Sequence, residues 1–220
     1  MSREGDRKRL ISEVYRLVTG EFADTATIND ICAMITFAKN MMLSDEEIEA
    51  LSGSGYDTLR IYREYNLSLS SRSLMDYDDQ MVTALDILRK YPDILAYFNG
   101  RFRYICVDEA QDTSKIQHEI IRLLAAKSGN IFMVGDEDQS IYAFRGAYPE
   151  ALIDFEKTYK NAQILFMEQN FRSTPEIIGV GYLQKGSERG EDFLGSVSSI
   201  GWRGVFRYIA CRTGIGTELQ

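Results

Sequence analysis

The segment YICVDEAQDTS (104–114) places three carboxylates directly after a short apolar run that is typical of a buried strand. Asp108, Glu109 and Asp112 lie within five residues, so their charges repel one another and lose hydration if the strand end is buried. A divalent cation is the usual partner of such a cluster. Mg²⁺ held by one or two carboxylates completes its shell with water and substrate phosphates, so the segment predicts a phosphate cradle elsewhere.

Two further segments, VGDEDQSIYAFRGA (134–147) and EQNFRST (168–174), combine polar, aromatic and basic residues after apolar runs. Gln139 could contact a phosphate or a positioned water, while Tyr142 and Phe144 offer flat faces on which bases stack. Arg172 could stabilise charge on a transferring phosphoryl group. The alternatives are a polar loop whose two rings pack on the core and an arginine in a surface ion pair.

The elements that must position these residues follow from periodicity. Residues 1–98 favour helices: Ser44 and Glu47 form a capping-box pattern, and Met81, Leu85 and Leu88 form an apolar stripe. From 101 to 178, short apolar runs (104–107, 131–134, 163–167) alternate with helical patterns, which predicts a parallel α/β sheet with crossover helices. Ligands of such sheets bind at the carboxyl ends of the strands, where Asp108, Glu109, Asp136 and Gln169 are expected.

The last segment, residues 179–220, is rich in glycine and has no clear period, so we expect it to be poorly ordered or poorly packed. The chain has 220 residues, 45% of them hydrophobic, and shows neither a membrane-length apolar run nor a secretion signal, which favours a cytoplasmic protein. Its three cysteines have no paired spacing, and Cys106 is expected to be a small core residue. A net charge of −8 argues against a broadly basic nucleic-acid surface but permits a local one.

Together, VDEAQD, GDEDQSIYAFRGA and EQNFRST closely resemble motifs II, III and IV of superfamily 1 DNA helicases of the UvrD/Rep/PcrA type. LMDYDDQ (74–80) resembles the DFDDL-like segment that precedes motif II in that family, and the resemblance extends over roughly residues 30 to 178. It implies an incomplete RecA-like P-loop NTPase domain over residues 101–178, preceded by an all-helical insertion subdomain over residues 1–98.

The resemblance also implies residue roles. Asp108 would hold Mg²⁺, Glu109 would activate the attacking water, and Gln139 and Arg172 would contact the γ-phosphate of ATP. Tyr142 and Phe144 would stack on single-stranded DNA, and Arg145 would link the nucleotide and DNA sites. Many family members have Trp where Phe144 stands, and phenylalanine keeps the stacking face without the indole donor.

The sequence departs from the family in one important way. The phosphate-binding loop of the family has the sequence G-x-x-x-x-G-K-[ST], yet the chain has no Gly-Lys pair. After Ile178 the sequence also no longer resembles that of the family. We therefore expect a fragment of an ATP-dependent helicase that is inactive alone. It would need the rest of the helicase, including the second motor domain, to move along single-stranded DNA and unwind duplex DNA. The alternatives are a non-enzymatic fragment that binds DNA or a protein, and a Mg²⁺-dependent nuclease built on Asp108, Glu109 and Asp136.

Overall fold

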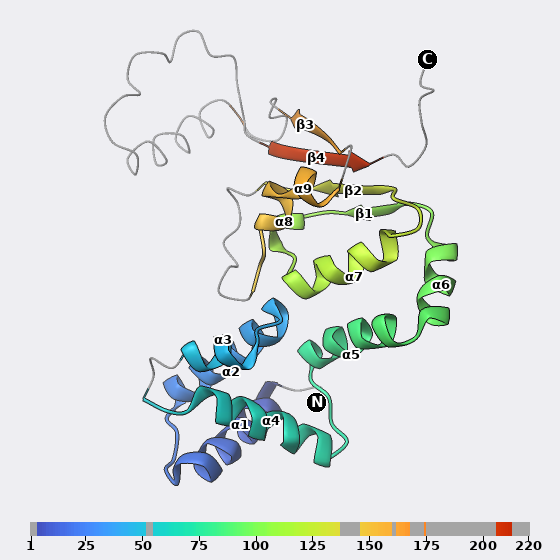
Figure 1. Cartoon of the computed structure of the whole chain (residues 1–220). Coiled ribbons are helices and arrows are strands. Elements are labelled where there is room, and N and C mark those ends of the chain that lie inside the picture. The colour runs from blue at the N-terminus through green and yellow to red at the C-terminus, as the bar shows by residue number, and fades with distance from the viewer. Residues whose placement is uncertain are drawn as a thin grey trace, which may run out of the picture.

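The computed structural model describes residues 4–51, 55–136, 146–159, 162–167, 174 and 206–212, which form a group of helices beside a four-stranded sheet (Figure 1). The helices that precede the sheet are α1 (Glu4–Thr19), α2 (Thr25–Met41), α3 (Asp45–Ala50), α4 (Thr58–Ser71), α5 (Tyr77–Lys90) and α6 (Pro92–Arg101). The predicted capping box is present, since Glu47 N–H donates to Ser44 Oγ and Ser44 N–H donates to the Glu47 carboxylate. The predicted stripe on α5 is buried at Leu85 and Leu88, whereas Met81 is exposed.

Helices α1, α2 and α4 share a hydrophobic core of their own. Its fully buried members recur at helical spacing along each element and are Leu10, Ile11, Val14, Ile31, Ile35, Ile61, Tyr65 and Leu69. Burial of this many large apolar side chains is sufficient to hold the three helices together, at about 1.5–3 kcal/mol for each fully buried side chain.

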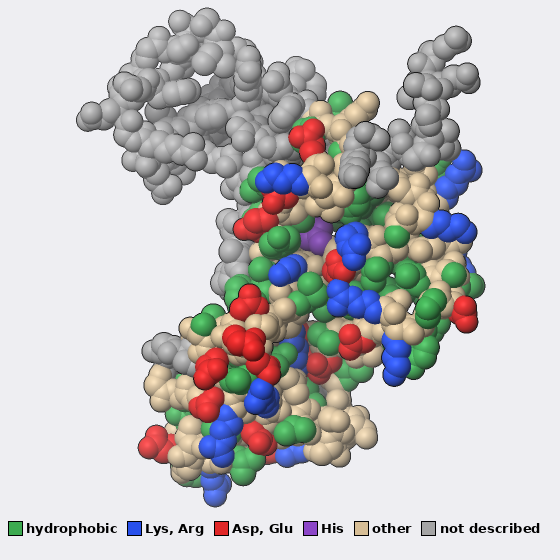
Figure 2. All heavy atoms as spheres, viewed as in Figure 1, with side chains coloured by type: hydrophobic (Ala, Val, Ile, Leu, Met, Phe, Trp, Pro, Cys, Tyr) green, Lys and Arg blue, Asp and Glu red, His purple; other side chains and the backbone are tan. Residues whose placement is uncertain are grey.

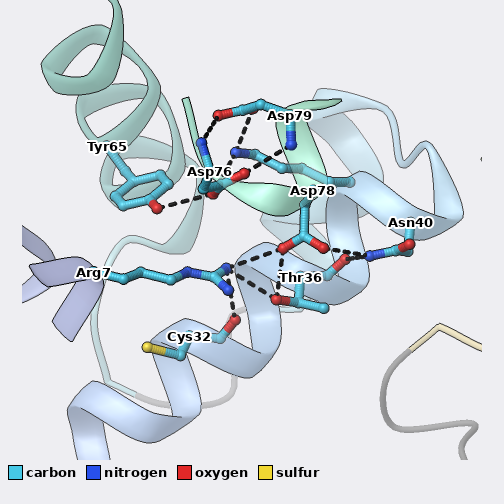
Figure 3. Close-up of polar contacts among 9 residues, drawn as sticks. Arg7, Cys32, Thr36, Asn40, Tyr65, Asp76, Asp78 and Asp79 are labelled. Carbon is cyan, nitrogen blue, oxygen red and sulfur yellow. Dashed lines mark hydrogen bonds and ion pairs between the residues drawn. The ribbon is translucent and has the colours of Figure 1, made fainter. Parts of the chain in front are cut away.

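A buried polar network joins this core to the start of α5 (Figure 3). Lys39 Nζ donates to Asp76 Oδ2 at 3.0 Å and to Asp79 Oδ1 at 2.6 Å, and the hydroxyl of Tyr65 donates to Asp76 Oδ2 at 2.9 Å. The side chains of Lys39 and Asp76 are 2% and 3% exposed. Burial alone would raise the pKa of Asp76, but the charge of Lys39 and the hydrogen bonds lower it overall, so the carboxylate of Asp76 is ionised at neutral pH.

A second set of contacts surrounds Asp78 in the same network (Figure 3). Its carboxylate accepts from Thr36 Oγ1 at 2.9 Å and from Asn40 Nδ2 at 3.0 Å, and it forms an ion pair with Arg7 at 3.3 Å. The acidic segment that resembles the DFDDL-like motif therefore fixes α5 against α1 and α2, with each carboxylate satisfied by donors from the preceding helices.

The sheet begins with β1 (Ile105–Val107), which pairs in parallel with β2 (Ile131–Val134), with Ile105 opposite Ile131. The connection between them contains a 3₁₀ turn, η1 (Ala110–Asp112), and the helix α7 (Lys115–Ala125), which lies between the sheet and the helical group in Figure 1. Two short helices follow, α8 (Glu150–Ile153) and α9 (Phe155–Thr158). They close a second core whose buried members are Ala110, Ala125, Ile131, Met133, Leu152, Phe155 and Tyr159.

The rest of the sheet is mixed, whereas the sequence predicts a parallel one. Strand β3 (Gln163–Met167) does not pair with β2; β4 (Phe206–Arg212) lies between them and is antiparallel to both. Strand β4 comes from the segment for which we expected poor packing. Its position has a simple physical reason, because β2 and β3 run in the same direction and leave facing rows of backbone donors and acceptors that a returning strand can satisfy.

Cys106 is exposed, contrary to the prediction that it is a core residue. It lies in β1, which is at one edge of the sheet and pairs only with β2 among the described strands. Successive side chains of a strand point to opposite faces, and the face that carries Cys106 is not covered by α7, α8 or α9. No helix in the described ranges is long and apolar enough to cross a membrane.

The buried ion pair leads to a stability prediction. Replacing Lys39 with Met leaves the buried Asp76 and the partly buried Asp79 without their cation, and the loss of one partner of a buried pair lowers the free energy of unfolding by about 3–5 kcal/mol. Arg72→Met is the matched control, because the ion pair of Arg72 with Glu13 is half exposed and contributes about 0–1 kcal/mol. Urea unfolding of both variants measures the difference, and equal losses would show that the Lys39 network does not stabilise the fold.

Candidate functional site

Two carboxylates that the sequence singles out lie at the carboxyl end of β1. Asp108 and Glu109 directly follow the strand, and both side chains are exposed. The backbone of Glu109 has a left-handed conformation, with φ 49° and ψ 44°. This conformation costs a residue other than glycine about 1–3 kcal/mol of strain. This conformation turns the chain sharply from β1 into η1, and the Glu109 N–H donates to Asp108 Oδ1 at 2.9 Å.

The side chain of Gln111 connects this turn to the end of β2. Gln111 Nε2 donates to Glu109 Oε2 at 2.7 Å, and Gln111 Oε1 accepts from the backbone N–H of Asp136 at 3.0 Å. Gln111 is 2% exposed and Asp136 is 5% exposed. As predicted, the parallel pairing of β1 and β2 therefore brings Asp108, Glu109 and Asp136 to one edge of the sheet. Sequence reasoning missed Gln111, although its amide lies inside the VDEAQD segment.

Six of the residues that the sequence singles out lie outside the described residues. Gln139, Tyr142, Phe144 and Arg145 fall within residues 137–145, and Gln169 and Arg172 fall within residues 168–173. The described chain resumes at Gly146. There Ala147 forms a β-bridge with Ser114, and Tyr148 N–H donates to Thr113 O at 2.9 Å. The described residues on both flanks of 137–145 therefore contact the segment 111–114.

Asp112 differs from the other two carboxylates of the turn. Its Oδ1 is buried and has no hydrogen-bond partner among the described residues. Burial raises the pKa of Asp112, and the nearby charge of Glu109 raises it further. In the described part of the chain, no group of three or more His, Cys, Asp and Glu side chains is arranged to hold a metal ion.

His118 is a second residue whose setting the sequence did not reveal, since it reads as an ordinary helix position. It lies on α7, its Nε2 is within hydrogen-bond distance of Thr113 Oγ1, and its ring packs edge-on against Tyr148. Figure 2 shows this histidine, the only one in the chain, partly covered by its neighbours. Burial lowers its pKa to about 4, against a smaller opposing effect of the Ala110 carbonyl, so the ring is neutral at pH 7.

Comparison with known proteins gives a consistent result. The UvrD/REP helicase N-terminal domain matches residues 1–160. The chain is 38% identical over 148 residues to the ATP-dependent DNA helicase PcrA of Staphylococcus aureus, an alignment that covers 66% of this chain and 20% of that protein. It is 37% identical over 150 residues to the Bacillus subtilis PcrA, covering 67% and 20%, and 38% identical over 173 residues to that of Leuconostoc citreum, covering 78% and 22%. The chain thus spans about a fifth of the length of these relatives.

The neutral His118 leads to a prediction about pH. Its pKa is 6.5 when unfolded and about 4 when folded, so the unfolded chain binds the extra proton first and the folded chain loses stability as the pH falls across this window. The loss amounts to about 3 kcal/mol for this shift. We expect the melting temperature of the wild type to fall from pH 6.5 to pH 4, and that of His118→Gln to change much less.

Asp112 provides an internal check on that experiment. Its raised pKa acts in the opposite direction, stabilising the folded chain at acid pH, and it is present in both proteins. The difference between wild type and His118→Gln therefore isolates the histidine. Parallel curves for the two proteins would show that His118 is not the group that titrates.

Proposed function

The chain belongs to the UvrD/REP helicase family, and from this membership we propose that it is part of an ATP-dependent helicase that couples ATP hydrolysis to movement on single-stranded DNA and to duplex unwinding. The observation that carries the proposal is the turn after β1. There, two exposed carboxylates are held beside the first residues of the loop whose sequence resembles motif III. A mixed sheet with functional side chains at the carboxyl ends of its parallel strands is the expected frame for nucleotide chemistry.

In the proposed site, Asp108 holds the Mg²⁺ ion and Glu109 accepts a proton from the attacking water. The donor set fits this division, because one exposed carboxylate with phosphate oxygens and water is a normal magnesium shell. Mg²⁺ held by Asp108 would neutralise the negative charge that develops on the phosphoryl group of bound ATP. Glu109 accepts from Gln111 at one oxygen, which orients the carboxylate. Gln139 and Arg172 are proposed to contact the γ-phosphate.

The DNA-binding part of the proposal concerns the loop 137–145. Tyr142 and Phe144 would stack on bases of single-stranded DNA, and Arg145 would link that strand to the nucleotide. The contacts of Asp136 on one flank, and of Ala147 and Tyr148 on the other, with residues 111–114 support this proposal, because they hold both flanking segments close to Glu109.

ATP hydrolysis by this site depends on groups outside the 220 residues. The sequence has no Gly-Lys pair to wrap the β- and γ-phosphates, and the chain covers a fifth of the PcrA helicases it resembles. We propose that the phosphate loop and the second motor domain come from other polypeptide segments.

The first prediction is that the chain alone does not hydrolyse ATP. Carboxylates without a phosphate cradle cannot hold the nucleotide in line with the attacking water, and that positioning supplies much of the rate. Phosphate release with and without Mg²⁺ is the measurement, and Glu109→Gln is the control for contaminating enzymes. Mg²⁺-dependent turnover by the wild type that Glu109→Gln abolishes would show that the cradle is not required.

The second prediction concerns DNA. We expect weak binding of single-stranded DNA at low salt, because the net charge of −8 opposes the approach of the strand. Tyr142→Ala together with Phe144→Ala should weaken binding about tenfold or more, since each stacked base contributes about 1–3 kcal/mol.

The matched control for DNA binding is Tyr97→Ala with Phe102→Ala, which removes two exposed rings at α6. Fluorescence anisotropy with a labelled oligonucleotide and thermal melting are measured on the same samples. Unchanged affinity with a large drop in melting temperature would assign Tyr142 and Phe144 to the core.

A further inference from the structure

Gln111 occupies a position that few side chains could fill. It is buried, and its two polar atoms face one hydrogen-bond acceptor and one donor. Nε2 faces a carboxylate oxygen of Glu109, which accepts, and Oε1 faces the backbone N–H of Asp136, which donates. A primary amide offers a donor and an acceptor on one planar group, whereas a carboxylate offers acceptors alone and an apolar side chain offers neither. The side chain therefore matches both neighbours at once.

The packing around Gln111 restricts movement of its amide. A Cβ added at Gly135 would lie 2.5 Å from Gln111 Oε1, 2.7 Å from Leu152 Cδ1 and 3.2 Å from the backbone nitrogen of Ala110. Any side chain at position 135 would thus displace the Gln111 amide or the core of α8. The glycine of the segment VGDEDQ is explained by this close approach.

The segment that contains Gln111 also contacts Ala147 and Tyr148, which follow residues 137–145. Ser114 bridges to Ala147, and Thr113 O accepts from Tyr148 N–H at 2.9 Å, while Gln111 Oε1 accepts from Asp136 N–H. Displacement of Asp136 or of Tyr148 is therefore opposed by hydrogen bonds to residues 111–114, close to Glu109.

We propose that Gln111 is a positioning residue that links the carboxylate of Glu109 to the backbone N–H of Asp136, just after β2. The significance for hydrolysis rests on the proposed function, because there Glu109 is the proton acceptor and its orientation would depend on the position of Asp136. The link itself is a property of this chain and requires neither ATP nor DNA.

The experiment at neutral pH follows hydrogen exchange of the Asp136 amide by NMR. Gln111→Met should speed that exchange about tenfold, the effect expected from loss of one buried hydrogen bond. Amides of the helical core, such as Ile35 and Ile61, should keep their rates and so report any global loss of stability. Gln117→Met is the matched control: it removes a glutamine amide that accepts from Ser114 N–H, and it should leave Asp136 unchanged.

Reciprocal exchange distinguishes a directed link from simple packing. In Gln111→Glu, two carboxylates face each other, whereas in Glu109→Gln combined with Gln111→Glu the new amide again donates to a carboxylate that still accepts from Asp136 N–H. We expect Gln111→Glu to speed exchange at Asp136 and the double variant to restore the wild-type rate. A packing role predicts no rescue, because both variants have the same side chain at position 111.

Absence of rescue in the double variant, or unchanged exchange in Gln111→Met, would overturn the proposal. Because no arm uses ATP or DNA, these outcomes are independent of the ATPase and DNA-binding results that test the proposed function.

Discussion

A buried lysine determines how the two parts of the molecule are joined. The ammonium of Lys39 is compatible with the interior only because Asp76 and Asp79 compensate its charge and Tyr65 completes the hydrogen bonding of Asp76. This requirement fixes the start of α5 against α2 and α4 (Figure 3). Since α5 packs on α7, and α7 follows the turn that contains Glu109, the network indirectly sets the orientation of the functional edge relative to the helical group.

The same network also reaches Gly146, on the C-terminal flank of residues 137–145, through Asn40. Its amide donates to Asp78, and its Cβ would lie 2.8 Å from a Cβ added at Gly146, where φ is +85°. Glycine at 146 is needed both for this conformation and for this close approach. Of the two described residues that flank 137–145, Asp136 contacts Gln111 and Gly146 lies against α2, so both contacts are formed by residues far apart in sequence.

Sequence reasoning was accurate where the signal is local and incomplete where it depends on neighbours. Three strands, α7 and the Ser44–Glu47 cap follow from periodicity and short-range hydrogen bonding, and the order of strands placed Asp108, Glu109 and Asp136 at one edge. The exposure of Cys106 and the antiparallel insertion of β4 depend on which strands are adjacent, which no local pattern specifies. Gln111 was missed for the same reason, because its partner Asp136 is 25 residues away.

The three clustered carboxylates after β1 repel one another, and solvent and hydrogen-bond donors within the chain offset part of this repulsion. Asp108 is solvated and accepts from the Glu109 N–H, while Glu109 is solvated and accepts from Gln111. Asp112 alone has a buried oxygen without a described partner, and its raised pKa reflects that. Two of the three carboxylates are therefore stabilised by water and by donors within the chain. The polypeptide therefore establishes the geometry of the turn by itself, and under the proposed function a Mg²⁺ ion would bind to carboxylates that are already positioned.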